Sequence, residues 1–385
     1  MQLFEQIVGA LLMLLILLDV FLTVLYARAD AGIISPRVSR FVWLAFKKLS
    51  KPFTKERERI LSFCGPTILV TYVLVWAFSL AVGAGLIIHP KLGTSVRATS
   101  EATRSDLITA IYAGGSSIAV VGVSDYSPET AGFRMMFLFN SLIGLSMISL
   151  TLTYLMQVYS ALNRRNVFGL DVQLGCGQKG DAAELIARLG PDGKFETGYA
   201  NLYQLAHEMT QAKESHHFYP VLFYFRFREP AYAIPRFTLV SLDAVALIRT
   251  TMDDDEYAWL KKSGAVAQLD SSARLLLETV WNTFLRGVVH EPSHTPYDKT
   301  RDLWHRRYFA ALRRLRQAGI RTIANEQAGV EDYVNLRSEW NGYISRMGPL
   351  LAYSPEEIDP VGSHPESSDE REEFQARVRS AYTSS

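Results

Sequence analysis

Three long apolar runs most constrain how this chain can fold, because each is long enough to cross a lipid bilayer as a helix. They cover about residues 7–26, 66–88 and 133–162, and Pro66 suits the first turn of its helix. The sequence after about residue 165 has the mixed composition of a water-soluble domain. We therefore predict an all-α membrane protein, with three transmembrane helices followed by a mostly helical domain.

Basic residues predict the orientation of these spans. Nine lysines and arginines lie between the first two spans, and Arg164 and Arg165 directly follow the third. The positive-inside rule places both regions in the cytoplasm. We therefore expect the N-terminus outside and the C-terminal domain in the cytoplasm.

Residues 37–51, within the basic linker, have the periodicity of an amphipathic helix. Their apolar positions share one helical face and their basic positions the other. The apolar face consists of Val38, Val42, Ala45, Phe46 and Leu49, and the basic face of Arg37, Arg40, Lys47, Lys48 and Lys51. We interpret this segment as an interfacial helix that binds membrane lipids along Arg37–Lys51. Packing on the cytosolic domain is the alternative.

Residues 105–128, between the second and third spans, form a different pattern. Ser105–Gly115 is apolar but too short to cross a bilayer, and the Gly-containing loop Ser116–Pro128 (SSIAVVGVSDYSP) follows it. Irregular backbone survives at membrane depth only where it is buried in protein or lines a water-filled path. A fourth full crossing would also place the C-terminal domain outside. The sequence therefore favours a re-entrant pore loop over a break inside a fourth span.

The order of short helix, loop and long helix resembles the pore module of the potassium channel superfamily, whose filter reads TVGYG followed by Asp. The GxxDxxP frame of that family is kept at Gly122, Asp125 and Pro128. The resemblance implies a filter whose carbonyl oxygens replace the hydration shell of a monovalent cation, K⁺ or Na⁺. It also implies a homotetramer, since one loop supplies a quarter of the carbonyl ring, and a gating hinge at Gly144. The implied filter residues are Val120, Val121, Gly122, Val123, Ser124 and Asp125.

Three departures from the family filter have physical consequences. Val120 replaces a threonine and lacks its hydroxyl ligand, and Val123 replaces a tyrosine that buttresses the filter. Ser124 replaces a glycine that adopts left-handed backbone at little cost. We therefore expect a cation channel with weakened potassium selectivity. The alternative is a non-conducting membrane sensor or scaffold that retains the channel fold.

The resemblance extends into the C-terminal half. Glu214–Arg226, Leu242–Ala244, Tyr333–Arg337 and Trp340 are similar to segments of bacterial single-pore-loop proteins grouped as the "two pore domain potassium channel family". The resemblance implies a location in the bacterial plasma (inner) membrane. It assigns no activity to named residues of the C-terminal half.

The predicted domains are a transmembrane pore domain at residues 1–165, a helical cytosolic domain at 166–353 and a disordered tail at 354–385. The tail is rich in Pro, Glu and Ser. The alternating residue pattern of Tyr219–Phe227 is also compatible with one β-strand. Helical spacing is found at residues 181–189, 199–215, 238–251, 256–262, 273–285, 301–317 and 331–347.

Other patterns predict no enzyme, metal site or cofactor. Gly175–Gly180 matches GxGxxG, but a dinucleotide fold needs a buried strand before it and βαβ units after it. His216–His217 has no second ligand cluster at a suitable spacing, so burial or capping is favoured over a pH sensor or metal ligand. Cys64 and Cys176 are predicted to be free thiols. The near-neutral net charge of +1 argues against nucleic-acid binding by the basic segment Arg301–Gln317.

Two polar residues inside the predicted spans have open roles. Asp19 lies in the first span, where a charge is costly and is usually paired or functional. Asn140 lies in the third span and either lines a vestibule or bonds to a neighbouring helix.

Overall fold

The fold divides into two compact units. The computed structural model describes residues 2–26, 28, 32–53, 56–99, 102–119, 125–285 and 298–360. One unit, here called the membrane unit, comprises Met1–Ser160 together with Phe218–Phe225. The other, the C-terminal unit, comprises Ala161–His217 and Arg226–Ser385. The chain therefore returns once from the C-terminal unit to the membrane unit.

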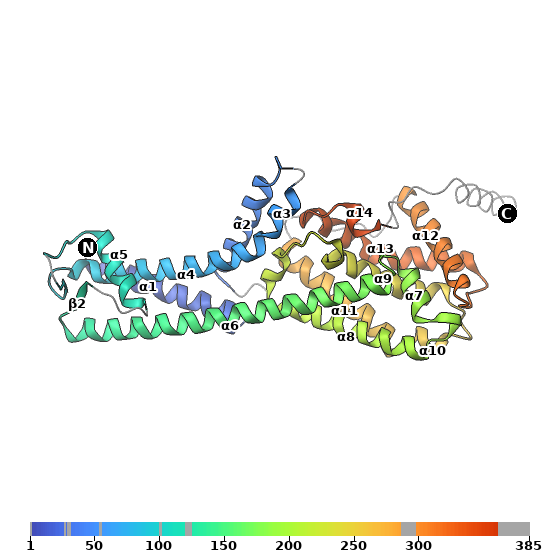
Figure 1. The fold of residues 1–385 in the computed structure, drawn as a ribbon, viewed down its shortest axis with the longest axis horizontal. Coiled ribbons are helices and arrows are strands. Elements are labelled where there is room, and N and C mark those ends of the chain that lie inside the picture. Colours follow the sequence, from blue (N-terminus) through green and yellow to red (C-terminus); the bar gives the residue numbers. More distant parts are fainter. Residues whose placement is uncertain are drawn as a thin grey trace. The chain divides into compact units, whose positions relative to one another are not determined.

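Among the described residues, three helical segments are long and apolar enough to span a bilayer: Gln2–Leu25, Arg57–Lys91 and Ala131–Gly175. The first is α1 (Gln2–Val20), continued by a π-helical turn at Phe21–Leu25. The second contains α3 (Arg57–Ser62), α4 (Cys64–Ile88) and a 3₁₀ turn at His89–Lys91. The third is the single helix α6 (Ala131–Gly175) (Figure 1). The chain is thus an all-α membrane protein, as its apolar runs predict.

Helices α1 and α4 pack closely because glycines face each other across their contact. A Cβ atom at Gly9 would overlap the backbone of Gly83, and a Cβ at Gly83 would lie 2.6 Å from Cγ of Met13. Small residues let helix backbones approach in this way in membranes. Beyond the helix contact, Nδ1 of His89 lies 3.0 Å from a carboxylate oxygen of Glu5, which ties the ends of the two helices together.

Two short strands and one short helix lie between α4 and α6. Strand β1 (Val96–Ala98) precedes α5 (Leu107–Ile118), and β2 (Tyr126–Pro128) leads into α6. A small apolar core joins them, with partly buried Phe133, Met136 and Phe137 of α6 packed against it. The buried members of this core are Ile88, Leu92, Val96, Ala110 and Ala113.

The segment Phe218–Phe225 adopts a 3₁₀ turn at Pro220–Tyr224, so the strand considered for Tyr219–Phe227 is wrong. Pro220 has no N–H for a β-ladder, and the aromatic side chains bury themselves separately. The Tyr219 ring lies 6.1 Å from Tyr154 of α6, and Phe225 packs against the bare backbone of Gly65 in α4. This part of the C-terminal half is therefore integral to the membrane unit.

The C-terminal unit is a helical bundle built around α9 (Ile234–Thr251), which is buried along almost its whole length. Helices α7, α11, α12, α13 and α14 all pack against it (Figure 1). A surface helix buries one stripe, whereas α9 is buried nearly all round, including polar residues such as Arg236 and Asp243. The other helices are α7 (Ala182–Leu189), α8 (Glu196–Phe218), α10 (Ala258–Lys261), α11 (Gly264–Val280), α12 (Asp298–Gln317), α13 (Glu326–Leu350) and α14 (Pro355–Ile358). Short 3₁₀ turns at Pro191–Gly193 and Pro230–Tyr232 and a π turn at Trp281–Leu285 complete the unit.

Two features differ from the sequence prediction. Helix α6 continues to Gly175, past the predicted end of the third span, so Gly175–Gly180 follows a helix and lacks the strand that a dinucleotide fold requires. Residues 354–360 are folded, because Ser354 and Glu357 form a capping box at the start of α14. The tail from residue 361 onward lies outside the described residues.

Candidate functional site

The candidate site is built around α5, which is too short to cross a membrane. Its 12 residues rise about 18 Å, against about 30 Å of hydrocarbon. Asp106 caps its N-terminus by accepting hydrogen bonds from Thr109 N at 2.9 Å and Thr109 Oγ1 at 2.8 Å. The helix ends at Ile118, directly before the predicted filter.

The chain enters and leaves this segment at the same place. Strand β1, before α5, pairs antiparallel with β2, after it, with Val96 opposite Pro128 and Ala98 opposite Tyr126. The pairing extends to Thr99, whose N–H donates to Asp125 O at 2.8 Å. The segment between the strands is consequently a loop that returns to its starting point.

Helix α5 is held against α4 by small residues. A Cβ on Gly85 would lie 2.7 Å from Cα of Ile111, and a Cβ on Gly114 would lie 2.5 Å from the Gly85 nitrogen. The two backbones therefore touch where these glycines meet. Any side chain at either glycine would push α5 away from α4.

The C-terminal end of α5 is also fixed to α6. Asn140 Nδ2 donates to Ser117 Oγ at 2.8 Å, and Ser141 Oγ donates to Ser117 O at 3.0 Å. One turn further along α6, a Cβ on Gly144 would overlap the carbonyl oxygen of Ile118. Asn140 thus bonds to the neighbouring helix, and Gly144 is a point of close packing. Helix α6 is continuous through Gly144, and the hinge stays a prediction.

Of the predicted filter, Val120–Ser124 lies outside the described residues, and Asp125 is described. Asp125 is exposed, and Tyr112 of α5 donates its hydroxyl to Asp125 Oδ2 at 3.3 Å. The backbone oxygen of Asp125 also accepts from Oγ1 of Thr99 at 3.1 Å. These contacts anchor the far end of the loop to α5 and to the segment before it.

Helix α6 carries a row of polar side chains on one exposed face. The residues are three or four positions apart, the spacing that places them one above another on a helix. They are Ser146, Ser149, Thr153, Gln157 and Ser160, all exposed.

Buried Gly144, Tyr154 and Val158 mark another face of α6, which packs within the subunit. Leu145, Ile148 and Leu152 occupy a third, exposed face, about 100° around the helix from the polar row. Sequence reasoning missed this polar row, although its three-and-four spacing was a readable signal.

Asp19 is fully buried and has a clear structural role. Its Oδ1 accepts from Ile33 N and Ile34 N at 2.7 Å, and its Oδ2 accepts from Ser35 Oγ at 2.7 Å and Trp76 Nε1 at 2.9 Å. The carboxylate therefore caps the N-terminus of α2 (Ser35–Leu49), where negative charge is favourable, and joins it to α1 and α4.

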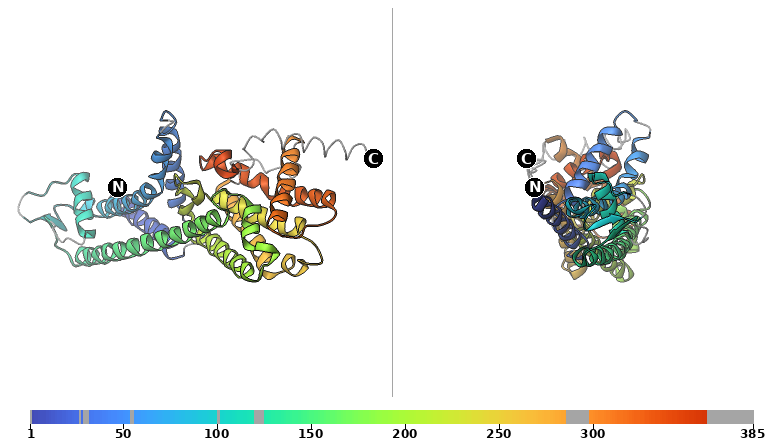
Figure 2. Two further views of the ribbon diagram at one scale, coloured as in Figure 1. Left: turned by 45° about the vertical axis from the view of Figure 1, so that its right-hand side comes forward. Right: turned by 90° about the vertical axis from the view of Figure 1, so that its left-hand side faces the viewer.

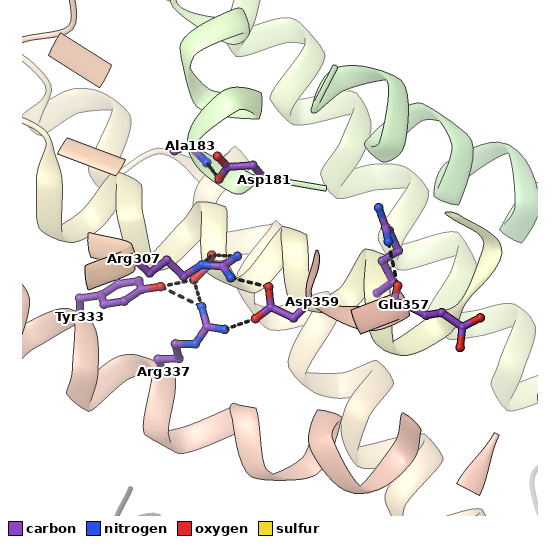
Figure 3. A network of polar contacts seen from close by, with 9 residues as sticks. Asp181, Ala183, Arg307, Tyr333, Arg337, Glu357 and Asp359 are labelled. Atoms are coloured by element: carbon purple, nitrogen blue, oxygen red, sulfur yellow. Dashed lines mark hydrogen bonds and ion pairs between the residues drawn. The ribbon is translucent and has the colours of Figure 1, made fainter. Parts of the chain in front are cut away.

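A second polar cluster lies inside the C-terminal unit (Figure 3). Buried Asp243 accepts from Tyr333 Oη and Arg337 Nη1 at 2.6 Å and from Arg307 Nε at 2.8 Å. Asp359 bridges the same two arginines from the other side. Burial acts to lower the pKa of Arg307, but the carboxylates of Asp243 and Asp359 outweigh it and hold that pKa well above its ordinary value. Two carboxylates balance two guanidinium groups, which is the arrangement of a structural network.

The remaining chemical candidates have structural roles. Burial, with the nearby charge of Arg165, lowers the pKa of His216 to about 3, so this imidazole is neutral and does not switch near pH 7. Arginines of α12 pair within the unit, for example Arg314 Nε with a Glu184 oxygen at 2.6 Å. The described residues contain no group of His, Cys, Asp and Glu able to hold a metal, and Cys64 and Cys176 are buried free thiols.

Comparisons with known proteins place the chain among membrane proteins without assigning an activity. It is 25% identical over 297 residues to the uncharacterized membrane protein YdjJ of Bacillus subtilis (strain 168), covering 76% of this chain and 83% of that protein. No protein-family model matches the chain. No solved structure matches it either.

Proposed function

We propose that the chain is a subunit of a homotetrameric cation channel in the bacterial plasma (inner) membrane, passing K⁺ or Na⁺ through a central pore. The observation that carries the proposal is the path of residues 96–128. A short helix lies between two strands that pair with each other, so this segment returns to the face from which it started. A loop of this form, set between two membrane-spanning helices, is the geometry of a re-entrant filter loop.

The orientation follows from the basic residues of the sequence. The N-terminus and the β1–β2 pair lie outside, and the C-terminal unit lies in the cytoplasm. The C-terminal end of α5 then points its partial negative charge into the membrane, which favours a cation beyond it. Exposed Asp125 adds negative charge at the outer mouth.

The polar row of α6 supports a water-filled path. Five exposed polar side chains lie along one face of a helix whose membrane-spanning part is apolar on average. Polar groups at membrane depth usually face a bundle interior or an aqueous cavity, since lipid cannot solvate them. In the tetramer this row lines the inner half of the pore, and the neighbouring apolar face meets another subunit or lipid.

Thiol modification tests this pore lining. Thr153→Cys or Ser149→Cys should lose most of its ion flux in liposomes when treated with a positively charged, membrane-impermeant methanethiosulfonate. Ile148→Cys and Leu152→Cys, on the apolar face, serve as matched controls and should keep their flux. The native thiols are buried, so the background reaction is small. Equal inhibition of both sets would contradict the assignment.

Selectivity is tested by restoring the family filter. The native protein and the triple variant Val120→Thr, Val123→Tyr, Ser124→Gly are compared in liposomes under K⁺ and Na⁺ gradients. We expect weak discrimination from the native filter and a higher potassium preference, or a rescued flux, from the variant, which regains the missing ligands. Absence of flux from both proteins would instead favour a non-conducting membrane sensor or scaffold.

A further inference from the structure

Helix α2 is fixed to the membrane-spanning helices by its inward face. The Asp19 carboxylate holds its N-terminus, and the hydroxyl groups of Ser39 and Tyr72 of α4 hydrogen-bond to each other. Further along, the buried Trp43 ring lies 6.0 Å from that of Tyr224. Figures 1 and 2 show α2, within the membrane unit, at a steep angle to α1 and α4. A helix that crosses the direction of two membrane spans lies near the plane of the membrane.

The apolar face that the sequence predicts to contact lipid is mostly turned toward the protein, with Leu49 alone of its five residues exposed. The predicted apolar face included Val42, which is buried within the protein. The aromatic and aliphatic residues that remain exposed are Phe41 at 75%, Leu44 at 63% and Leu49 at 66%. Phe41 and Leu44 are three positions apart and form an outward row, whereas Leu49 lies farther around the exposed side of the helix.

Basic residues lie beside this row. Arg37, Arg40 and Lys48 are exposed, and α2 contains no acidic residue. Burial, together with the neighbouring cations Arg57 and Lys51, lowers the pKa of Lys47. A surface that combines large apolar groups with positive charge is complementary to an anionic lipid leaflet, where apolar groups enter the acyl region and cations meet phosphate.

We propose that the outward face of α2, formed by Arg37, Arg40, Phe41, Leu44, Lys48 and Leu49, binds anionic phospholipid headgroups of the cytoplasmic leaflet. The connection of α2 to α1 at one end, and through α3 to α4 at the other, holds this face at the level where both spans leave the membrane. The inference rests on the membrane orientation proposed above and is independent of ion conduction.

Spin labels test the insertion of this face. Phe41→Cys and Leu44→Cys are labelled with a nitroxide in the full chain, in vesicles of phosphatidylcholine with phosphatidylglycerol. Tyr203→Cys, an exposed aromatic position of the C-terminal unit, is the control. Labels at 41 and 44 should be accessible to oxygen and protected from a water-soluble nickel chelate, and the label at 203 should show the reverse. Equal nickel access at all three positions would overturn the proposal and point to a protein partner.

Lipid retention tests the choice of headgroup. The full chain is examined by native mass spectrometry with equal amounts of phosphatidylglycerol and phosphatidylcholine. The double variant Arg40→Gln/Lys48→Gln should show a several-fold loss of bound phosphatidylglycerol relative to the native chain. Phosphatidylcholine should be unaffected. Arg97→Gln, at an exposed arginine of β1, should retain both lipids as the native chain does. Unchanged phosphatidylglycerol in the double variant would overturn the proposal. Neither measurement uses flux, so a failure of conduction leaves the lipid result readable.

Discussion

At the scale of single residues, the charged groups that sequence singled out are mainly structural. Asp243, Tyr333 and Arg337 belong to segments that carry the resemblance to bacterial single-pore-loop proteins, and they meet in one buried network. Asp19, whose role the sequence left open, accepts hydrogen bonds from the start of α2 and from Trp76 of α4. Both carboxylates are fully buried. A buried carboxylate of this kind is tolerated because each of its hydrogen-bond partners is in place. Removing the carboxylate leaves those buried partners unpaired, which destabilises the folded state by more than the intact network stabilises it.

Asp243→Asn should destabilise the C-terminal unit by about 3–5 kcal/mol, because it leaves two buried arginines with one carboxylate between them. The measurement is thermal unfolding of the detergent-solubilised full chain, followed by tryptophan fluorescence. Asp254→Asn is the matched control, since the Asp254 side chain is 83% exposed and should change stability by less than about 0.5 kcal/mol. Similar unfolding temperatures for the two variants would show that the network contributes little.

At the scale of elements, α5 is defined by its neighbours. It contacts α4 through Gly85 and Gly114, and α6 through Asn140 and Gly144. Its length alone rules out a crossing, but these contacts fix where its C-terminal end lies. The position of the loop after Ile118 therefore depends on the spacing of three helices.

Gly144→Ala should displace the C-terminal end of α5, because the added methyl group overlaps Ile118 O. Overpacking of this kind typically costs about 1–3 kcal/mol. We expect a lower unfolding temperature and faster hydrogen exchange in residues 107–119. Gly132→Ala is the control on the same helix, since a Cβ there meets nothing within 4 Å. An altered open probability at unchanged stability would favour the hinge instead.

At the scale of the whole molecule, α6 is the candidate span that a single subunit covers least. Only 11% of its most apolar window is buried, against 28% for the first span and 39% for the second. In a single subunit, the polar row of α6 would face lipid. Polar groups that face lipid cost free energy, because lipid cannot solvate them. Assembly around a central axis removes this free-energy cost by turning the polar row toward water.

We expect the full chain to give a mass of four copies by native mass spectrometry in a mild detergent. Leu145→Asn places a polar group on the apolar face of α6 and should shift the population toward smaller species. Ser146→Asn, next to it on the polar row, should leave the tetramer intact because that side faces water. Monomers or dimers alone in the native protein would contradict fourfold assembly.

The sequence by itself determined the membrane class, the three spans, the short α5 and the helical character of the C-terminal half. These follow from apolar length and periodicity, which are local properties of the chain. It did not reveal what Asp19, Asn140 and Asp243 contact, nor that Phe218–Phe225 returns to the membrane unit. For the three polar residues, the partners are separated in sequence by 14 residues, for Asp19 and Ile33, up to 94 residues, for Asp243 and Arg337. Local propensity carries no information at such separations, so only the packing of helices in three dimensions decided them.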